Sequence, residues 1–415
     1  MIRKSRRKPG HDTYVAEQVA VRMNSTLETR LRIGREESVS RLQEERRNAI
    51  LSRGCLLFGA GNNGRQVARQ LATLEAAPQV HGFVSDVRDH LGIVVDGVRV
   101  FSREEAAEVF GVEIPVVNCV YRADISIARV SSGLRESGFE IVVSLPAFYD
   151  AFADELGGFL CFSSADFIQT KADRIVEAFN LLADHASRST FLRLLDQRLS
   201  LNFEHEQTFD RLIYFPAFLD RSRLCAEGHE FTFVDCGAYN GDTLRAFSAW
   251  QVRPGDRAIA IEPDPASFSA LERAAAQLRQ SAGIEIFCIN AAAGSHDGTI
   301  GFAAMNNESS RVSGDSDQSV RMVTVDSVVS DQGIMPCYVK YDTEGYEMEA
   351  LAGTCRTIQG GRTSLAVSVY HKPADLWEIP LALKDMMDGY GFHLREHGPD
   401  GIDTVLYAVA PRGAR

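Results

Sequence analysis

The sequence predicts an α/β protein with a smaller Rossmann-like parallel sheet near the N-terminus, a larger Rossmann-like sheet in the C-terminal half, and a helical linker between them. Apolar, strand-like runs alternate with helix-like segments in residues 53–150 and again in residues 231–415, a pattern typical of parallel sheets covered by helices. In each region the first run ends in a glycine-rich turn, at Gly59 and at Gly237. A chain of 415 residues also has the length of two or three domains.

Composition and charge narrow the range of partners. The chain is 45% hydrophobic and 24% charged, as expected for a globular protein. Its formal net charge is −12, but residues 1–50 hold 12 Lys/Arg against 7 Asp/Glu, a balance of +5, which leaves the remainder near −17. Because phosphate binding needs a basic face, this acidic body disfavours nucleic acid as a partner.

The sequence gives no sign of export or of a membrane span. No apolar run reaches the roughly 18–20 residues that cross a bilayer, and no apolar core follows the basic N-terminus, as a secretory signal would require. The eight cysteines are scattered and form no C-x-x-C pair. We therefore expect a cytoplasmic protein with reduced cysteines and no cysteine-based metal cluster.

Residues 1–52 read as a basic tail followed by a helix. Apolar residues recur at four-residue spacing along the first part of the helical pattern, namely Val15, Val19, Met23, Leu27 and Leu31. A narrow apolar stripe with charged flanks is typical of a helix that packs on a partner helix. A short coiled-coil contact in a homo-oligomer is one interpretation, and a solvated basic tail is the other.

Residues 53–150 predict a Rossmann-like module of the nucleotide-binding type. The run GCLLF is followed by the turn Gly59, Gly61, Gly64 and an amphipathic helix, and the next strand ends at Asp86. A G-x-G-x-x-G turn between a strand and a helix suits a phosphate-bearing ligand, and an acid some 20 residues later suits a ribose or sugar hydroxyl.

The same residues resemble the N-terminal Rossmann modules of sugar acyltransferases and polysaccharide-biosynthesis proteins, which read GAG-x-x-G, helix, GF-x-D. That resemblance implies a nucleotide-sugar ligand. Two alternatives stay open, namely NAD(P) and a module kept for packing without any ligand. The module has no Tyr-x-x-x-Lys pair for hydride transfer, which disfavours the oxidoreductase interpretation.

Residues 151–230 predict the helical linker. Apolar residues recur at helical spacing around Ile175 and Phe179, and again from Phe191 to Leu199. We expect a helical hairpin that covers the cofactor site of the following domain.

The turn after the first strand of residues 231–415 predicts the cofactor. It reads D-x-G-x-x-x-G, with Asp235 at its head and Gly237, Ala238 and Gly241 within it. An acidic head repels the pyrophosphate of a dinucleotide but attracts the ammonium and sulfonium of S-adenosylmethionine (SAM). The next apolar run ends in Glu262, where a carboxylate can accept both ribose hydroxyls. We therefore expect Asp235 to orient the methionine part and Glu262 to bind the ribose.

The ordered set of segments in this region resembles the FkbM family of SAM-dependent methyltransferases. The resemblance runs from about Tyr214 to Ala410 and includes the segment K-x-D-x-E-G-x-E, which begins at Lys340. It implies a class I methyltransferase sheet and methylation of a hydroxyl oxygen on a sugar or polyketide-like acceptor. The segments FHLREH and DTVLYAVA are expected to form the antiparallel strand pair that ends such a sheet.

Three side chains are candidates for the acceptor side. His371 follows the predicted fifth strand and is the expected general base, because an acceptor hydroxyl must lose its proton. Asp342 and Glu344 follow the fourth strand. Together with His371 they are also an oxygen and imidazole set that Mg²⁺ or Mn²⁺ accepts, although our first expectation is no metal. Asn290, at the end of the third strand, is expected near the adenine.

The sequence therefore predicts a SAM-dependent O-methyltransferase that acts on a hydroxyl of a sugar, nucleotide-sugar, glycan or glycolipid. One alternative acceptor is a secondary-metabolite hydroxyl. A different class, a non-catalytic binding or scaffold protein in glycan assembly, also stays open.

Overall fold

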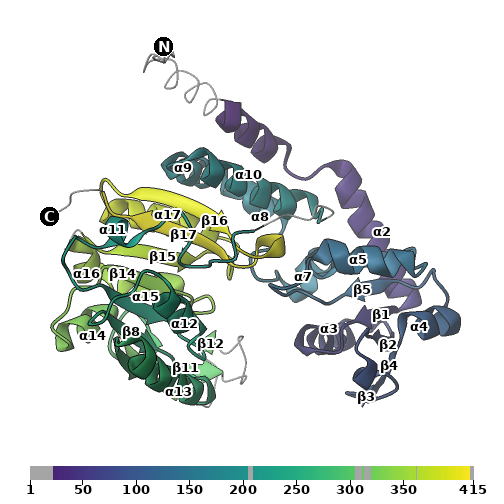
Figure 1. Cartoon of the computed structure of the whole chain (residues 1–415). Helices are drawn as coiled ribbons and strands as arrows, with labels where there is room; N and C mark the ends of the chain where they lie inside the picture. Colours follow the sequence, from purple (N-terminus) through teal and green to yellow (C-terminus); the bar gives the residue numbers. More distant parts are fainter. Residues whose placement is uncertain (1–21, 204–208, 304–310, 313–318, 361, 412–415) are drawn as a thin grey trace, which may run out of the picture. The chain divides into compact units, whose positions relative to one another are not determined.

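The computed structural model describes residues 22–203, 209–303, 311–312, 319–360 and 362–411 (Figure 1). Two compact units divide the chain. Unit 1 comprises residues 1–180 and 188–207, and unit 2 comprises residues 181–187 and 208–415. The boundary thus falls inside the segment expected to be a separate helical linker, whose helices belong mainly to unit 1.

Unit 1 is built on a six-stranded sheet with the order β3-β4-β2-β1-β5-β6. Every neighbouring pair is parallel except β3–β4, so the predicted alternation of strands and helices is present. The strands are β1 Cys55–Phe58, β2 Val80–Val84, β3 Val94–Val95, β4 Val98–Phe101, β5 Val116–Asn118 and β6 Val142–Ser144. The connecting helices are α3 Asn62–Thr73, η1 Arg88–His90, α4 Arg103–Phe110 and α5 Ile127–Glu136.

Further helices complete unit 1. Residues 22–33 are helical, and the others are α2 Glu37–Arg53, α6 Leu145–Ala151, α7 Ala153–Leu156, α8 Ala165–Thr170, α9 Ala172–Leu181 and α10 His185–Ser200. Helix α2 packs on α6, where the buried Gln43 side chain donates to the Ala147 carbonyl at 2.8 Å. Leu27 and Leu31 of the predicted stripe are buried within this chain, so they are not available to a partner helix. Residues 1–21, with the start of the stripe, lie outside the described residues.

Unit 2 is built on a seven-stranded sheet with the order β16-β17-β15-β14-β7-β8-β9. Strand β17 is antiparallel to both of its neighbours, and the other pairs are parallel. This order is the one expected for a class I methyltransferase sheet, and β16–β17 is the predicted terminal pair. The strands are β7 Thr232–Cys236, β8 Arg257–Ile261, β9 Glu285–Ile289, β14 Tyr338–Tyr341, β15 Ser364–Ser368, β16 Gly391–Glu396 and β17 Thr404–Val409.

A small second sheet and eight further helical segments are described in unit 2. The sheet has the order β10-β13-β11-β12, with β10 Ala292–Ala293, β11 Gly298–Ala303, β12 Arg311–Val312 and β13 Ser319–Val323. The helices are α11 Arg221–Leu224, α12 Asp242–Ala249, α13 Pro265–Ala282, α14 Val325–Asp331, α15 Glu347–Ala352, α16 Cys355–Gln359, α17 Asp375–Met386 and η2 Pro399–Gly401. No helix in the described part of the chain is long and apolar enough to cross a membrane.

Strand register brings the predicted site residues of unit 2 to one edge of its sheet. Asp235 on β7 pairs with Lys340 on β14, and Cys236 pairs with Ile261 on β8. Because these strands are parallel, their carboxyl ends meet at the same edge. Glu262 follows β8 directly, Asp342 follows β14, and His371 lies three residues after the end of β15.

Candidate active site

The turn after β7 is shaped by contact with the neighbouring strand end. Gly237 has φ +82°, and a Cβ atom there would lie 1.8 Å from the backbone oxygen of Asp342. Glycine is therefore required because two backbones approach each other, a cause that the sequence did not reveal. Gly241 caps α12 in the left-handed conformation, and the backbone N–H groups of Gly237 and Ala238 both donate to the Ile261 carbonyl.

Asp235 is fully buried and forms an ion pair with Lys340. The Lys340 Nζ lies 3.0 Å from Asp235 Oδ1 and donates to the Gly237 carbonyl at 2.6 Å. Burial raises the pKa of Asp235 to about 6, although Lys340 opposes this shift. The charge of the predicted acidic head is thus partly offset within the protein, and the role of Asp235 towards a cationic ligand stays a prediction.

Glu262 is held rigidly at the tip of β8. Its Oε2 accepts from the Tyr239 N–H and its Oε1 from the Asp264 N–H, both at 2.8 Å. Burial raises the pKa of this carboxyl to about 7. The side-chain amide nitrogen of Asn290 is already used within the protein, because Nδ2 donates to the carbonyls of Glu262 and Pro263 at 2.8 and 3.1 Å.

His371, Asp342 and Glu344, which the sequence predicted on the acceptor side, lie together. His371 Nε2 lies 3.6 Å from Asp342 Oδ1 and 3.6 Å from Glu344 Oε2. On its other side, His371 Nδ1 lies 2.9 Å from Oε1 of the buried Glu347. The Tyr214 hydroxyl donates to Asp342 Oδ2 at 2.8 Å. Four carboxylate and imidazole groups thus meet beyond the ends of β14 and β15.

Their mutual charges set the protonation states. Burial raises the pKa of Asp342, but Lys340 and His371 outweigh it and hold that pKa below its ordinary value. Burial lowers the pKa of His371, but Glu347, Glu344 and Asp342 together raise it to about 10. At neutral pH the imidazole is therefore protonated and Asp342 is ionised. These surroundings disfavour the predicted role of His371 as the base, since a protonated imidazole cannot accept a proton.

Three atoms of this cluster are buried without a hydrogen-bond partner among the described residues, namely Asp342 Oδ1, Glu347 Oε2 and His371 Nε2. One ligand atom from each of these residues lies within 4.8 Å of the others. Buried polar atoms are normally satisfied, so a ligand group is expected here. The donor set fits an acceptor hydroxyl, and its oxygen and imidazole chemistry also fits a small divalent ion.

The comparisons with known proteins bear on this site. Residues 235–394 match the family model of the methyltransferase FkbM domain. This part of unit 2 is therefore similar to the methyltransferase FkbM domain and is called the FkbM domain. Its model match begins at Asp235 and spans β7 to β16, and so includes every residue of the site except Tyr214.

A solved structure of a methyltransferase has a similar fold. The crystal structure of methyltransferase FkbM from Methylobacillus flagellatus matches with a TM-score of 0.67 at 21% identity, over 96% of this chain and 98% of that chain. At this identity the likeness shows the fold alone. An rRNA methylase from Streptococcus thermophilus matches 44% of this chain and 86% of its own at 9% identity, and its TM-score of 0.27 is too low to indicate a shared fold. No curated protein matches the chain.

Outside the FkbM domain, the glycine turn of unit 1 has the geometry of its motif. Gly59 has φ +104°, and a Cβ atom on Gly64 would lie 1.9 Å from the Gly59 oxygen, so both glycines serve the tight turn and the close helix packing. Gly61 faces open space at the start of α3. Asp86, however, forms two hydrogen bonds with Arg103. Ligand binding at this turn stays a prediction.

Two partners in the FkbM domain were not among the predicted site residues. Glu347 is the last residue of the K-x-D-x-E-G-x-E segment, and no role was predicted for it. In the structure it forms the hydrogen bond with His371. Tyr214 is a buried aromatic residue, and its hydroxyl donates to Asp342 Oδ2. No spacing in the sequence reveals either contact, because each joins segments that are distant along the chain or folded back by a turn.

Proposed function

We propose that the protein is a SAM-dependent O-methyltransferase that acts on a hydroxyl of a sugar, a nucleotide-sugar or a glycan. The observation that carries this proposal is the fixed carboxylate of Glu262 within a methyltransferase FkbM domain. Each of its oxygens accepts one backbone N–H and keeps a further lone pair. Two ribose hydroxyls of a bound nucleoside can donate to these lone pairs.

The charge of the strand edge supports a cationic donor. Five carboxyl groups lie there, and the cations Lys340 and His371 among them offset only part of this negative charge. This excess of acid repels phosphate and attracts the ammonium and sulfonium of SAM. A dinucleotide would bring the opposite charge to the same edge.

Methyl transfer is an in-line displacement that the site promotes by alignment. The acceptor oxygen forms a bond with the methyl carbon while the carbon–sulfur bond breaks, and the electron pair of that bond stays on sulfur. The acceptor proton must leave at the same time. We assign its acceptance to Asp342 Oδ1, because this oxygen is ionised and has no hydrogen-bond partner among the described residues.

His371 then acts as a positioning group. Its protonated ring, held by Glu347, lies 3.6 Å from Asp342 Oδ1 and stabilises that carboxylate next to the acceptor oxygen. A divalent ion held by Asp342, Glu347 and His371 is the alternative. Such an ion would supply Lewis-acid stabilisation of the acceptor oxygen, and it would have to displace the imidazole proton.

The proposal of a sugar-type acceptor is based on features of unit 1 and not on the methyl-transfer site. Its glycine turn, with Gly61 open at the start of α3, suits a phosphate-bearing ligand, and similar modules accompany sugar-handling enzymes. A secondary-metabolite hydroxyl is the alternative acceptor.

The test uses SAM with a labelled methyl group, the full-length chain, and a panel of nucleotide-sugars, glycans and small hydroxylated metabolites. We expect label in a sugar-containing product and none with the Asp235→Ala variant. Label only in sugar-free products would contradict the acceptor, and no label in any product would contradict methyl transfer. Activity that EDTA abolishes and Mn²⁺ restores would replace the metal-free scheme with the metal alternative.

A further inference from the structure

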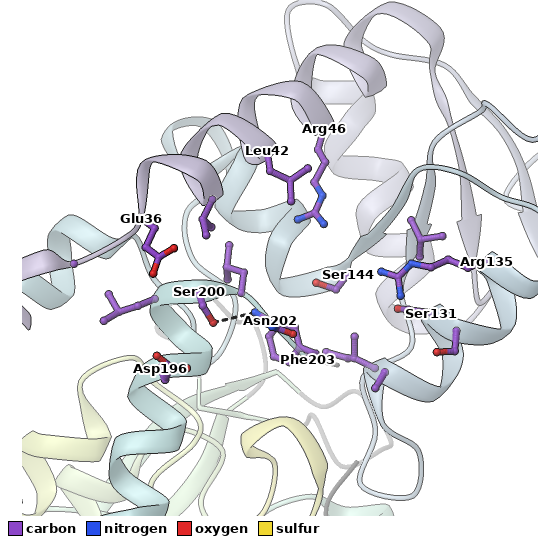
Figure 2. A pocket seen from close by; sticks show the side chains of 18 of the residues that line it. Glu36, Leu42, Arg46, Ser131, Arg135, Ser144, Asp196, Ser200, Asn202 and Phe203 are labelled. Carbon is purple, nitrogen blue, oxygen red and sulfur yellow. Dashed lines mark hydrogen bonds between the residues drawn. The ribbon is translucent and has the colours of Figure 1, made fainter. Parts of the chain in front are cut away.

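Unit 1 contains a cavity that is separate from the methyl-transfer site and from the glycine turn. Its volume is about 710 Å³, within the range of small-molecule sites. Its walls come from α2, from α5 and β6, and from the end of α10 with the residues that follow it (Figure 2). Gly59, Gly61, Gly64 and Asp86 do not line it.

Two arginines give one end of this cavity an uncompensated positive charge. Arg46 on α2 and Arg135 on α5 extend towards the same part of the cavity, next to Ser144 (Figure 2). Arg46 donates to the Gln43 Oε1 at 2.7 Å, and no described carboxylate forms an ion pair with either arginine. Arg30 and Asp196, by contrast, neutralise each other at 3.2 Å on another wall. Arg46 is half-buried and Arg135 is exposed, so both positive charges are accessible to an anion that enters the cavity.

The pKa of Arg46 agrees with this geometry. Burial lowers it, and the positive charge of Arg135 lowers it further. The two groups therefore sense each other, and an anion between them would relieve the repulsion.

Two serine hydroxyl groups line the cavity together with the arginines. Ser131 Oγ accepts from Asn118 Nδ2 at 3.3 Å, and Ser144 Oγ accepts from the Ala147 N–H at 3.4 Å. Because these contacts use each hydroxyl oxygen only as an acceptor, its hydrogen can donate to a ligand in the cavity. Guanidinium forks with hydroxyl donors are the usual means of binding phosphate groups.

The remaining walls suit the body of such a ligand. Val39, Leu42, Leu199 and Phe203 contribute apolar surface. A cavity with a cationic end and an apolar wall accepts a phosphorylated molecule whose other part is a ring or a hydrocarbon.

We infer that unit 1 binds a phosphate-bearing small molecule in this cavity, with the phosphate between Arg46 and Arg135 and the apolar or aromatic part against Leu42 and Phe203. The site does not depend on methyl transfer. A nucleoside diphosphate and a prenyl diphosphate share the required chemistry, and the experiment separates them.

The experiment is calorimetric titration of the full-length chain with inorganic pyrophosphate, uridine diphosphate and geranyl diphosphate. We expect saturable binding of at least one diphosphate, which Arg135→Gln and Arg46→Gln each weaken at least about tenfold, the effect of losing a hydrogen bond to a charged group. Arg129→Gln is the matched control, since Arg129 is an exposed arginine of the same helix that does not line the cavity. It should leave the affinity within about twofold.

Each outcome is decisive. Tighter binding of uridine diphosphate than of geranyl diphosphate assigns a nucleoside body to the ligand, and the reverse order assigns a hydrocarbon body. No saturable binding of any probe up to 10 mM would overturn the inference. So would equal weakening by Arg129→Gln and Arg135→Gln, because that result indicates unspecific surface charge. Folding is checked by the unfolding temperature of each variant.

Discussion

His371 Nδ1 and Glu347 Oε1 lie 2.9 Å apart in the interior of unit 2. The same oxygen also accepts from the N–H groups of Thr343 and Gly345 at 2.9 and 3.2 Å. Glu347 therefore fixes both the turn after β14 and the orientation of the imidazole, and it links the end of β14 to the end of β15.

The first prediction concerns this pair. Glu347→Gln keeps an oxygen for the turn but removes the charge that faces His371, so the pKa of His371 should fall from about 10. Losing a charge-assisted hydrogen bond costs about 1.5–3 kcal/mol. If all of this free energy stabilises the transition state, turnover falls roughly 10–100-fold. Imidazole titration by NMR and the kcat of the variant check both effects. Glu349→Gln, on the same helix, is the control, and an unchanged pKa of His371 in Glu347→Gln would contradict the account.

The second prediction concerns the proton acceptor. If ionised Asp342 accepts the proton, kcat should be nearly independent of pH between 6 and 9, since the pKa of Asp342 lies below its ordinary value and that of His371 near 10. A kcat that rises about tenfold per pH unit over this range would instead make neutral His371 the base. The measurement is the pH dependence of kcat at saturating SAM and acceptor.

The third prediction is that His371→Ala leaves the Kd for SAM within about twofold but lowers kcat by about 10²–10³-fold, the effect of losing a group that stabilises charge at the reacting centre. The side chain lies on the acceptor side, 3.6 Å from Asp342 Oδ1, and contacts none of the expected SAM-binding residues through a described bond. Titration with SAM and steady-state kinetics measure the two quantities. Turnover that does not change would remove His371 from the reaction altogether.

The fourth prediction follows from the pKa of Glu262, which burial raises to about 7. Ribose hydroxyls donate to the ionised carboxylate, so SAM binding favours the form present above that pKa and weakens as pH falls. The affinity should fall by up to about tenfold per pH unit below 7. Titrations at pH 6.0, 7.0 and 8.0 test this. The Glu262→Gln variant should bind weakly at all three values, and a wild-type Kd independent of pH would rule out the proposed ribose contact.

The fifth prediction compares the cost of alanine substitution at two glycines that have similar positive φ angles. Gly237 and Gly255 have φ values of +82° and +93°, but a Cβ atom on Gly237 would lie 1.8 Å from Asp342 O, whereas one on Gly255 would meet nothing within 4 Å. Gly255→Ala should cost only the backbone strain, about 1–2 kcal/mol. Gly237→Ala should cost about 1–3 kcal/mol more, because its neighbours must move. Equal shifts in the unfolding temperature would show that the close approach is unimportant.

The sequence predicted the architecture of unit 2 well, because apolar runs, glycine turns and terminal carboxylates are local features. The positions of Asp235, Glu262 and Asp342 at one sheet edge follow from parallel strands alone. The contacts that set protonation do not follow from local patterns. Lys340 faces Asp235 through strand register, and Glu347 reaches His371 because positive φ values at Glu344 and Gly345 turn the chain.

The central claim is that the edge formed by β7 and β8 binds SAM, and calorimetric titration of the full-length chain with SAM tests it most directly. We predict saturable binding to one site, weakened at least about 100-fold by Glu262→Ala, which removes two hydrogen bonds to a charged group. The binding should be unchanged by Glu272→Ala, an exposed residue of α13. The absence of any heat of binding up to millimolar SAM, in a folded protein, would contradict it.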